Sequence, residues 1–529
     1  MEAAIHLPVR FPPKHSPYWP HSSHSSHSST AEIPHVPVRD ARARSVPGVC
    51  IWAVVLIVML PVLVLRPHHG PVPTALLLQG VVVAHTGGAL TRVLTAPKVR
   101  LVALGFWMFS YIWFGLAPLA QLTSDTYPWP YRAGEETSFA AVTVVELGLL
   151  AYSAGTALAV RGAVTRATRP GALERLLARR LAPWRVLALC GLALALAVLL
   201  IPGQPGGVVA YFTSRQAVHE TGALNDSSDS FLQPLRSWSL SVPAFWGLLG
   251  LLRLPRLPGG DRLLRGLRWL LLPLLVAVNI VVNNPISKPR FWAGTVLLTL
   301  LFNADRLCRP RASRALAGAV LATVLVVFPY SDYFRYDDRQ TVAVVSMAEQ
   351  FIAKGDYDAF QQVQTGLDYA RDKGVSPRSA LGPLLFMVPR SVWPDKPDDT
   401  GIALARYAGY DFLNLSAPLW IESYLWAGPA AVALVFCLLG TAGRRMDEAR
   451  ERLSDRRGTL AALLVPAFAF YQLMFLRGSL LGITGPMLLM MTVPLLISTS
   501  TRQVSVPASP AAPSAPVPHA SLPHPGGHL

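Results

Sequence analysis

The feature that most restricts how this chain can fold is a series of long apolar segments that recurs from Val49 to Thr499. A helix that crosses a membrane needs about 20 mostly apolar residues. About twelve segments approach this length: 49–65, 74–91, 101–122, 138–160, 184–202, 238–252, 269–285, 291–304, 315–331, 419–440, 459–476 and 480–499. Only 15% of the residues are charged, whereas soluble proteins carry about 25%. The sequence therefore predicts an all-α, polytopic membrane protein of about twelve transmembrane helices.

Basic residues occupy every second loop between these segments. Arginines precede the first segment and cluster after the second, fourth, sixth, eighth and tenth segments. Cytoplasmic loops of membrane proteins carry an excess of Lys and Arg, so we expect a multi-pass protein of the cell membrane with both termini in the cytoplasm. This orientation explains most of the net charge of +17, so no nucleic-acid partner is needed to account for that charge. The expected partner of the apolar segments is the lipid bilayer.

The same pattern divides the chain into five parts. We expect a disordered cytoplasmic tail at 1–47, transmembrane helices one to nine at 48–331, a large extracytoplasmic loop at 332–418, transmembrane helices ten to twelve at 419–499, and a second disordered cytoplasmic tail at 500–529. Apolar residues of the large loop recur at helical spacing, namely Met347, Phe351, Phe360, Val363 and Leu367. They predict short amphipathic helices lying on the membrane surface.

Cations on the predicted outer side run against this charge distribution. They are Lys288, Arg290, Arg335, Arg390, Lys396 and Arg477. Guanidinium groups near membrane depth are costly and usually line a pathway or are paired, and several that converge would suit a phosphate. Alternatively, each pairs with a nearby acid such as Asp332 or Asp395, or reaches lipid headgroups. Arg290 and Arg477 lack close acidic neighbours in the sequence, which favours the anion site for these two.

Two carboxylates lie within or beside apolar segments. Glu422 falls near the outer mouth of the tenth segment, and Glu146 lies in the middle of the fourth. A buried carboxylate either pairs with a cation or is held protonated by desolvation. For Glu422 a catalytic role and a structural ion pair are both open, whereas for Glu146 the ion pair is favoured. The four cysteines show no C-x-x-C spacing, and no phosphate-loop, dinucleotide or zinc-protease motif is present, so neither metal nor cofactor is predicted.

Several short blocks in the second half of the chain are similar to a known family. They are Gly355-Asp-Tyr-Asp-Ala-Phe360, Pro389-Arg-Ser-Val-Trp-Pro-Asp-Lys-Pro397 with Thr400-Gly401, Leu415-Ser-Ala-Pro-Leu-Trp-Ile-Glu-Ser-Tyr424 with Gly428 and Gly440, and Leu476-Arg-Gly-Ser479. In order and spacing they resemble the Wzy-type O-antigen and oligosaccharide repeat-unit polymerases. The resemblance covers about residues 280–480, and the first half of the chain matches only in hydropathy and topology.

This resemblance implies a reaction. It implies a metal-independent, inverting glycosyltransferase on a helical fold akin to the GT-C class, which joins repeat units at the outer face of the membrane. The donor would be a glycan on a polyprenyl diphosphate, and the acceptor a hydroxyl of another lipid-linked unit. Such a donor carries its own leaving group, so no cofactor is required, and arginines can stabilise the charge that develops on the diphosphate.

The resemblance also implies roles for individual residues. The diphosphate and adjacent sugar would be bound by Arg290, Arg335, Arg390 and Arg477, with Lys396 assisting and Lys288 competing with Arg290 for one position. Glu422 is the first candidate for the base and Asp332 the second. Trp393 and Tyr424 could stack on sugar rings.

Two other functions remain open. A transporter or flippase of lipid-linked oligosaccharide, or of another anion, would use the same cationic site for translocation; such proteins usually contain internal repeats, and none is evident in this sequence. A scaffold of an envelope-assembly complex is the weaker alternative. For a polymerase, a chain-length regulator or a flippase is a candidate partner of the basic cytoplasmic loops.

Overall fold

The computed structural model describes most of the chain between the two predicted tails. The described residues are 46–67, 72–165, 171–204, 206–212, 232–254, 262–286, 288–304, 307, 309–326, 345–413, 415–453 and 458–500. Two predicted site residues, Asp332 and Arg335, lie outside them, as do nearly all residues of the tails predicted at 1–47 and 500–529. The domain boundaries drawn from the sequence therefore stay predictions.

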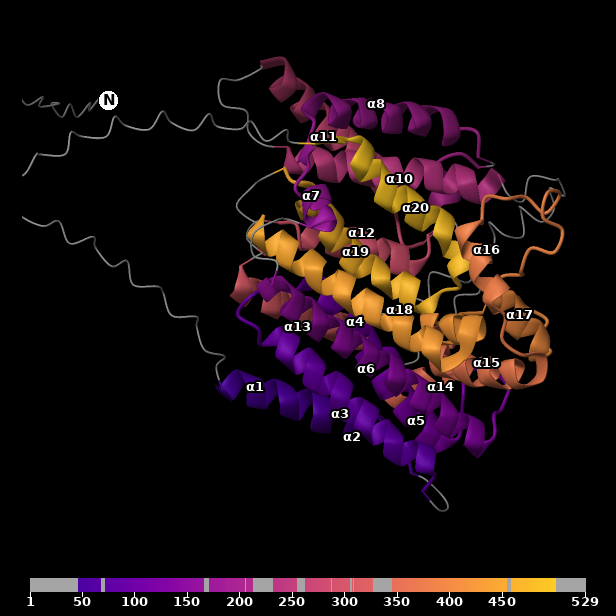
Figure 1. The fold of residues 1–529 in the computed structure, drawn as a ribbon. Helices are drawn as coiled ribbons and strands as arrows, with labels where there is room; N and C mark the ends of the chain where they lie inside the picture. The colour runs from indigo at the N-terminus through magenta and orange to yellow at the C-terminus, as the bar shows by residue number, and fades with distance from the viewer. Residues whose placement is uncertain are drawn as a thin grey trace, which may run out of the picture. The chain divides into compact units, whose positions relative to one another are not determined.

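Nearly all of the described secondary structure is helical (Figure 1). The first half contains α1 (Val46–Ala53), η1 (Val54–Met59), α2 (Leu60–Val64), α3 (Thr74–Leu94), α4 (Leu101–Phe109), η2 (Ser110–Leu116), α5 (Ala117–Ser124), α6 (Glu135–Thr165), α7 (Ala172–Leu177), α8 (Pro183–Leu200), η3 (Val209–Phe212) and α10 (Leu232–Arg253). The second half contains α11 (Arg262–Val282), α12 (Arg290–Leu301), α13 (Pro310–Val326), α14 (Met347–Ala353), η5 (Gly355–Tyr357), α15 (Ala359–Lys373), η6 (Pro377–Ala380), α16 (Leu381–Leu384), α17 (Thr400–Tyr407), α18 (Leu419–Arg452), α19 (Leu460–Arg477) and α20 (Leu480–Leu496). The segments η1 and η2 are π-helical.

Within the described residues, eight helices are long and apolar enough to cross a membrane. They are Val46–Val64, Thr74–Leu94, Leu101–Ser124, Glu135–Gly162, Pro183–Leu200, Arg262–Val282, Leu419–Arg452 and Leu460–Arg477. Two shorter apolar helices are α12 and α20, and the remaining predicted segments correspond to α10 and α13. The all-helical fold and the apolar helices of membrane-spanning length are thus confirmed, while the number twelve stays a prediction.

The helix formed by α4, η2 and α5 lies at the centre of one hydrophobic cluster. Every residue from Leu101 to Thr123 is buried, which is the pattern of a helix enclosed by others on all sides. A second cluster includes side chains of α8, α10, α11, α12 and α20. Helix α19 supplies buried residues to both clusters, with Leu460 in the first and Leu463 in the second.

Helices α6 and α18 make the most extensive helix pair, and glycines allow their backbones to approach closely. A Cβ added at Gly155 would lie 2.0 Å from the carbonyl oxygen of Cys437, and one added at Gly440 would lie 2.2 Å from the carbonyl oxygen of Tyr152. Small residues at such contacts are typical of helix pairs in membranes. The glycines at these contacts therefore determine how closely the backbones of α6 and α18 approach each other.

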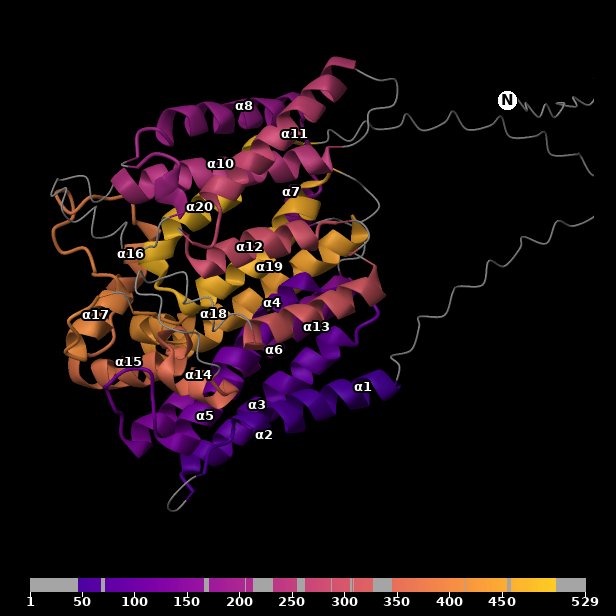
Figure 2. The same ribbon diagram turned by 180° about the vertical axis from the view of Figure 1, so that it is seen from behind.

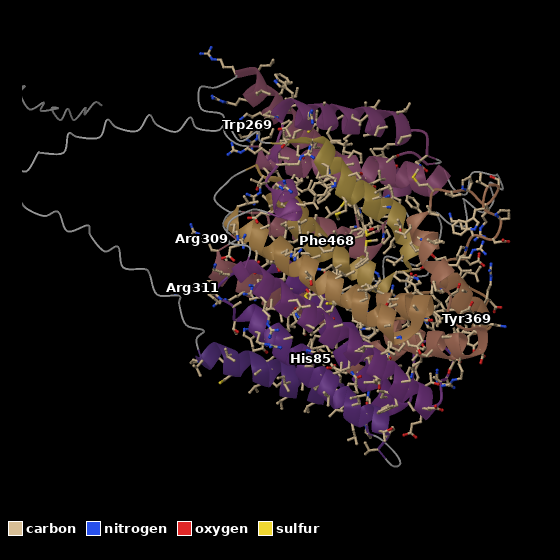
Figure 3. All side chains as sticks on the ribbon, in the orientation of Figure 1. His85, Trp269, Arg309, Arg311, Tyr369 and Phe468 are labelled. Carbon is tan, nitrogen blue, oxygen red and sulfur yellow. The ribbon has the colours of Figure 1, made fainter. Side chains whose placement is uncertain are left out.

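The short helices of the 345–418 segment gather at one end of the bundle in both Figures 1 and 2. Figure 3 places Tyr369 at this end and Arg309 and Arg311 at the other. Helix α15 packs into the protein, since its residues 359–367 are all buried, and its expected position on a membrane surface stays a prediction. Gln361 explains the burial of a polar helix: its amide nitrogen donates to the carbonyl oxygens of Trp129 and Tyr131, 2.8 Å away in each case.

Two short strands tie the chain together at the end of the bundle opposite α14–α17. Strand β1 (Arg180–Leu181) pairs antiparallel with β2 (Ser498–Thr499), with Arg180 opposite Thr499 and Leu181 opposite Ser498. Arg180 also forms an isolated bridge with Thr459. The connections before α8, before α19 and after α20 are thereby joined through their backbones.

Replacing Gly155 by Ala is expected to destabilise the protein, because the new methyl group would overlap the α18 backbone. Overpacking costs about 1–3 kcal/mol, which should appear as a lower free energy of unfolding of the detergent-purified protein. The matched control is Gly162→Ala in the same helix, where the added methyl group meets open space. Equal stability of the two variants would contradict the close packing of α6 and α18.

Candidate functional site

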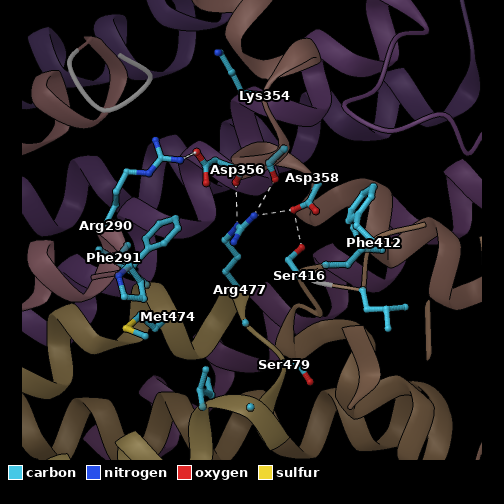
Figure 4. Close-up of a pocket in the computed structure, with 18 of the residues that line it drawn as sticks. Arg290, Phe291, Lys354, Asp356, Asp358, Phe412, Ser416, Met474, Arg477 and Ser479 are labelled. Atoms are coloured by element: carbon cyan, nitrogen blue, oxygen red, sulfur yellow. Dashed lines mark hydrogen bonds and ion pairs between the residues drawn. The ribbon is translucent and has the colours of Figure 1, made fainter. Parts of the chain in front are cut away.

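A cavity of about 1030 Å³ lies where the turn before α12, the segment around η5, the region of α17, and the α19–α20 connection meet. Charged side chains that line it are Lys288, Arg290, Lys354, Asp356, Asp358, Asp399 and Arg477. Apolar and aromatic side chains, among them Phe291, Phe412 and Met474, complete the wall (Figure 4). A volume of this size accommodates a ligand larger than a simple anion.

Arg290 forms the first ion pair of the cavity. Its Nη2 lies 2.6 Å from Oδ2 of Asp356, and both side chains are mostly buried. The two residues are far apart in the sequence, so their contact depends on the packing of α12 against the η5 segment. Arg290, which has no acidic residue close to it in the sequence, is thus paired with an aspartate that is distant in the sequence.

Arg477 forms the second ion pair and lies at the centre of Figure 4. Its Nη2 donates to Oδ1 of Asp358 at 3.1 Å and to the carbonyl oxygen of Gly355 at 2.9 Å, and its Nε donates to the carbonyl oxygen of Asp356 at 3.0 Å. Its guanidinium carbon also lies 5.4 Å from the ring centroid of Phe291. One arginine therefore holds the whole Gly355–Asp358 turn.

The remaining polar groups of this turn are held from the bundle side. Asp358 accepts from Ser416 at 2.6 Å and from the indole nitrogen of Trp129 at 2.9 Å. The indole nitrogen of Trp113 donates to the carbonyl oxygen of Asp356 at 2.7 Å. A Cβ at Gly355 would come within 2.5 Å of Trp129, so only glycine permits this close approach. The turn is rigid because its carbonyls and carboxylates are bonded from several elements.

Asparagines position the turn that carries Lys288 and Arg290. Asn279 donates to the carbonyl oxygen of Ala244 at 2.9 Å, and Asn283 accepts from the indole nitrogen of Trp292 at 2.8 Å. These bonds tie the end of α11 to α10 and to the start of α12. Lys288 is buried, with its ammonium nitrogen 5.4 Å from the ring centroid of Trp238. Both competing cations therefore reach the cavity.

Asp399 differs from the other two cavity carboxylates. Its Oδ1 accepts the backbone N–H of Gly401 at 3.0 Å and so caps the start of α17. Asp356 and Asp358 each pair with an arginine, whereas within the described part of the chain no cation pairs with Asp399. It is partly exposed and lines the cavity, so it is the carboxylate best placed to accept a proton from a ligand.

Glu422 lies behind the cavity wall and does not line it. Its Oε1 accepts from the hydroxyl of Ser479 at 2.9 Å and from the backbone N–H of Leu480 at 3.0 Å. Only 1% of its surface is exposed. The residue predicted as the base therefore anchors the α19–α20 connection next to Arg477, and Ser479 separates it from the cavity.

The predicted motif around Trp393 also lies outside the cavity lining. Arg390 pairs with Asp398 at 2.7 Å and donates to the carbonyl oxygen of Lys396 at 2.8 Å. Lys396 donates to the carbonyl oxygens of Phe386 and Val388, and partial burial, followed by the charge of Arg390, lowers the pKa of its ammonium group. The two cations hold their own loop, as the alternative of local pairing predicted.

The two residues predicted to stack on sugar rings, Trp393 and Tyr424, also lie outside the cavity lining. The ring centroid of Trp393 lies 6.0 Å from the guanidinium carbon of Arg378. Tyr424 packs against the first hydrophobic cluster, which surrounds the helix formed by α4, η2 and α5. Oε1 of Glu146 lies 2.7 Å from Nδ1 of His85, so this carboxylate has a polar partner inside the bundle, and the structural ion pair favoured from the sequence stays a prediction.

Sequence reasoning missed several residues that line the cavity. They are Trp129, Lys354, Asp356, Asp358, Asp399 and Phe412. The sequence does contain one signal for the two buried carboxylates, the acidic pair Asp356-Tyr-Asp358 in the segment expected to form the large outer loop. Asp399 could have been found as a helix N-cap before Thr400-Gly401. Within the described residues, no group of three or more His, Cys, Asp or Glu is placed to hold a metal ion.

Removing Arg477 is expected to destabilise the protein, because Asp358 would be left as a buried charge that is only 1% exposed. Breaking such a pair costs about 3–5 kcal/mol. Arg477→Ala should therefore lower the free energy of unfolding in detergent, and adding Asp358→Asn should restore part of it. Arg406→Ala, which breaks an exposed pair with Asp398, is the control and should cost about 0–1 kcal/mol. Equal losses in both single variants would contradict the buried pair.

Comparison with known proteins leaves the site to be interpreted from its own geometry. No protein-family model matches the chain, and no curated protein and no solved structure matches it. The contacts described above are therefore the basis for assigning a function.

Proposed function

We propose that the protein is a membrane-embedded glycosyltransferase that joins polyprenyl-diphosphate-linked oligosaccharide repeat units. The observation that carries this proposal is the cavity that Arg290 and Arg477, from distant parts of the chain, line together with Asp399, a carboxylate that no cation pairs with in the described part of the chain. Cations that can bind a diphosphate and a carboxylate that can accept a proton are what this transfer requires. The resemblance of residues 280–480 to repeat-unit polymerases supports the same reaction.

The proposed setting is the outer face of the cell membrane. The basic residues Arg309 and Arg311 lie at the end of the bundle opposite Tyr369 (Figure 3), and the cavity is built partly from the segment that contains Tyr369. If the basic end is cytoplasmic, the cavity opens at the outer face, and an even number of crossings, twelve in our proposal, returns both termini to the cytoplasm.

The donor diphosphate would bind beside Arg290. The guanidinium group of Arg290 keeps 13% of its side chain exposed while it is paired with Asp356. A diphosphate oxygen can replace this carboxylate, because guanidinium groups bind phosphate and carboxylate in the same bidentate geometry. Lys288 and Lys354 line the same cavity and add positive charge. As the bond between C1 and the diphosphate oxygen breaks, this charge stabilises the polyprenyl diphosphate that leaves.

The acceptor would bind on the side of Asp399. The acceptor hydroxyl oxygen forms the new bond to C1 from the face opposite the leaving diphosphate, which inverts the configuration, and its proton passes to the Asp399 carboxylate. Atoms and charge balance, since the diphosphate leaves with the electron pair of the broken bond. The base predicted at Glu422 is thereby replaced by Asp399, with Glu422 holding Ser479 and the start of α20.

A transporter of lipid-linked oligosaccharide is the second candidate, and it would use the same cations. The capped, cavity-lining Asp399 favours the enzyme, because translocation of an anion gains nothing from an additional negative charge in the site. The two functions differ in their products: only the enzyme lengthens the glycan.

The first test is product length. Purified protein in detergent, given a lipid-linked repeat unit, should produce a ladder of longer lipid-linked glycans. Arg290→Ala should reduce the rate at least about a hundredfold, because a positioned charge in such a site is worth about 3 kcal/mol or more. Lys396→Ala is the control, since Lys396 holds only its own loop. EDTA should not alter the ladder. Unchanged substrate together with translocation in sealed vesicles would favour the transporter.

The second test identifies the base. Asp399→Asn keeps the shape of the side chain but cannot accept the proton, so kcat should fall by about 10²–10⁴-fold with a small change in KM. Glu422→Gln keeps an acceptor for Ser479 and should reduce kcat far less. The reverse order of the two effects would return the role of base to Glu422.

A further inference from the structure

Six aromatic side chains form two groups of three rings, one that begins in the cavity wall and one farther from it, and a hydrogen bond joins the groups. They are Phe412, Trp129, Tyr410, Tyr131, Tyr407 and Tyr369, which we call the aromatic row. Only Phe412 and Trp129 line the cavity. In these groups the ring centroids lie 4.6 Å apart for Phe412 and Trp129, 6.3 Å for Trp129 and Tyr410, 6.3 Å for Tyr131 and Tyr407, and 5.5 Å for Tyr407 and Tyr369. The hydroxyl of Tyr410 accepts the backbone N–H of Tyr131 at 3.2 Å and joins the two groups.

The rings are held in place by hydrogen bonds to three polar side chains, of which Gln361 is buried, Asp368 is partly buried and Asp372 is exposed. Gln361 accepts the backbone N–H of Trp129 at 3.1 Å and donates to two carbonyls of the same loop. The hydroxyl of Tyr131 donates to Asp368 at 2.8 Å, and that of Tyr407 donates to Asp372 at 2.6 Å. The bond to Asp372 raises the pKa of Tyr407, and partial burial raises that of Tyr131. Both hydroxyls therefore remain protonated over the whole physiological range.

The aromatic row is recessed but not covered. None of its six side chains is buried, and only Phe412, at 38%, is more than about a third exposed. A thin chain with C–H faces and hydroxyl groups fits this recess. Its C–H faces can contact the rings, and its hydroxyls can bond to the neighbouring carboxylates.

We propose that the aromatic row is a binding track for an oligosaccharide several sugars long, whose end lies in the cavity. This inference rests on the proposed function and extends it: the track would hold the glycan of one lipid-linked unit while its terminal sugar reacts beside Arg477. Figure 4 places Phe412 on the side of Arg477 opposite Arg290, so the glycan would leave the cavity away from the diphosphate.

Binding can be measured without catalysis. Malto-, cello- and chitohexaose would be added to the detergent-purified protein, and contact would be read by saturation-transfer NMR. We expect at least one hexasaccharide to bind more tightly than its disaccharide. Tyr369→Ala combined with Tyr407→Ala should weaken that binding about tenfold, corresponding to about 1.4 kcal/mol, while Tyr407→Phe, which keeps the ring, should bind as the wild type does.

The control is Trp269→Ala, which removes an aromatic ring that is 73% exposed at the far end of the bundle (Figure 3). Failure of all three hexasaccharides to bind the wild type, unaltered binding in the double variant, or an equal loss in the control would overturn the track. The outcome is separable from the proposed function, because binding of a free hexasaccharide is measured without any glycosyl transfer. If no ladder of longer glycans forms but the double variant still loses hexasaccharide binding, the binding track is supported and the proposed glycosyl transfer is contradicted.

Discussion

The candidate site depends on the neutralisation of one buried carboxylate. Asp358 is only 1% exposed, and an unpaired charge there would be too costly to keep. Arg477, Ser416 and Trp129 satisfy it from α19, from the segment before α18 and from the loop before α6. Because each donor must be within hydrogen-bond distance, the charge fixes three elements relative to one another. The cavity is the space that remains between them.

The fold was largely predictable because hydrophobic burial acts on whole segments. Stretches of apolar residues predicted where the helices lie, within a few residues at most ends. They did not predict which helix is central, since a run such as 101–122 looks the same whether lipid or protein surrounds it. The burial of α15 was not predicted either, because the apolar spacing showed only one buried face, whereas the polar Gln361 is also buried and bonds to backbone groups of a distant loop.

The site was predictable only in part. Arg290 and Arg477 were singled out because no acid lies near them in the sequence, and both indeed reach the cavity. Their partners, Asp356 and Asp358, are 66 and 119 residues away, which is why no local pattern could connect them. Arg390 shows the opposite case, since its partner Asp398 is eight residues away and the pairing is local. For these three arginines, the distance in sequence to the acidic partner distinguishes those that line the cavity from the one that does not.

Helix α19 has a mechanical position that follows from the two hydrophobic clusters. It contributes side chains to both of them, and its last residue is Arg477. The packing of both clusters therefore sets where this helix lies along its axis. It thereby also sets where the guanidinium group that holds the Gly355–Asp358 turn is placed.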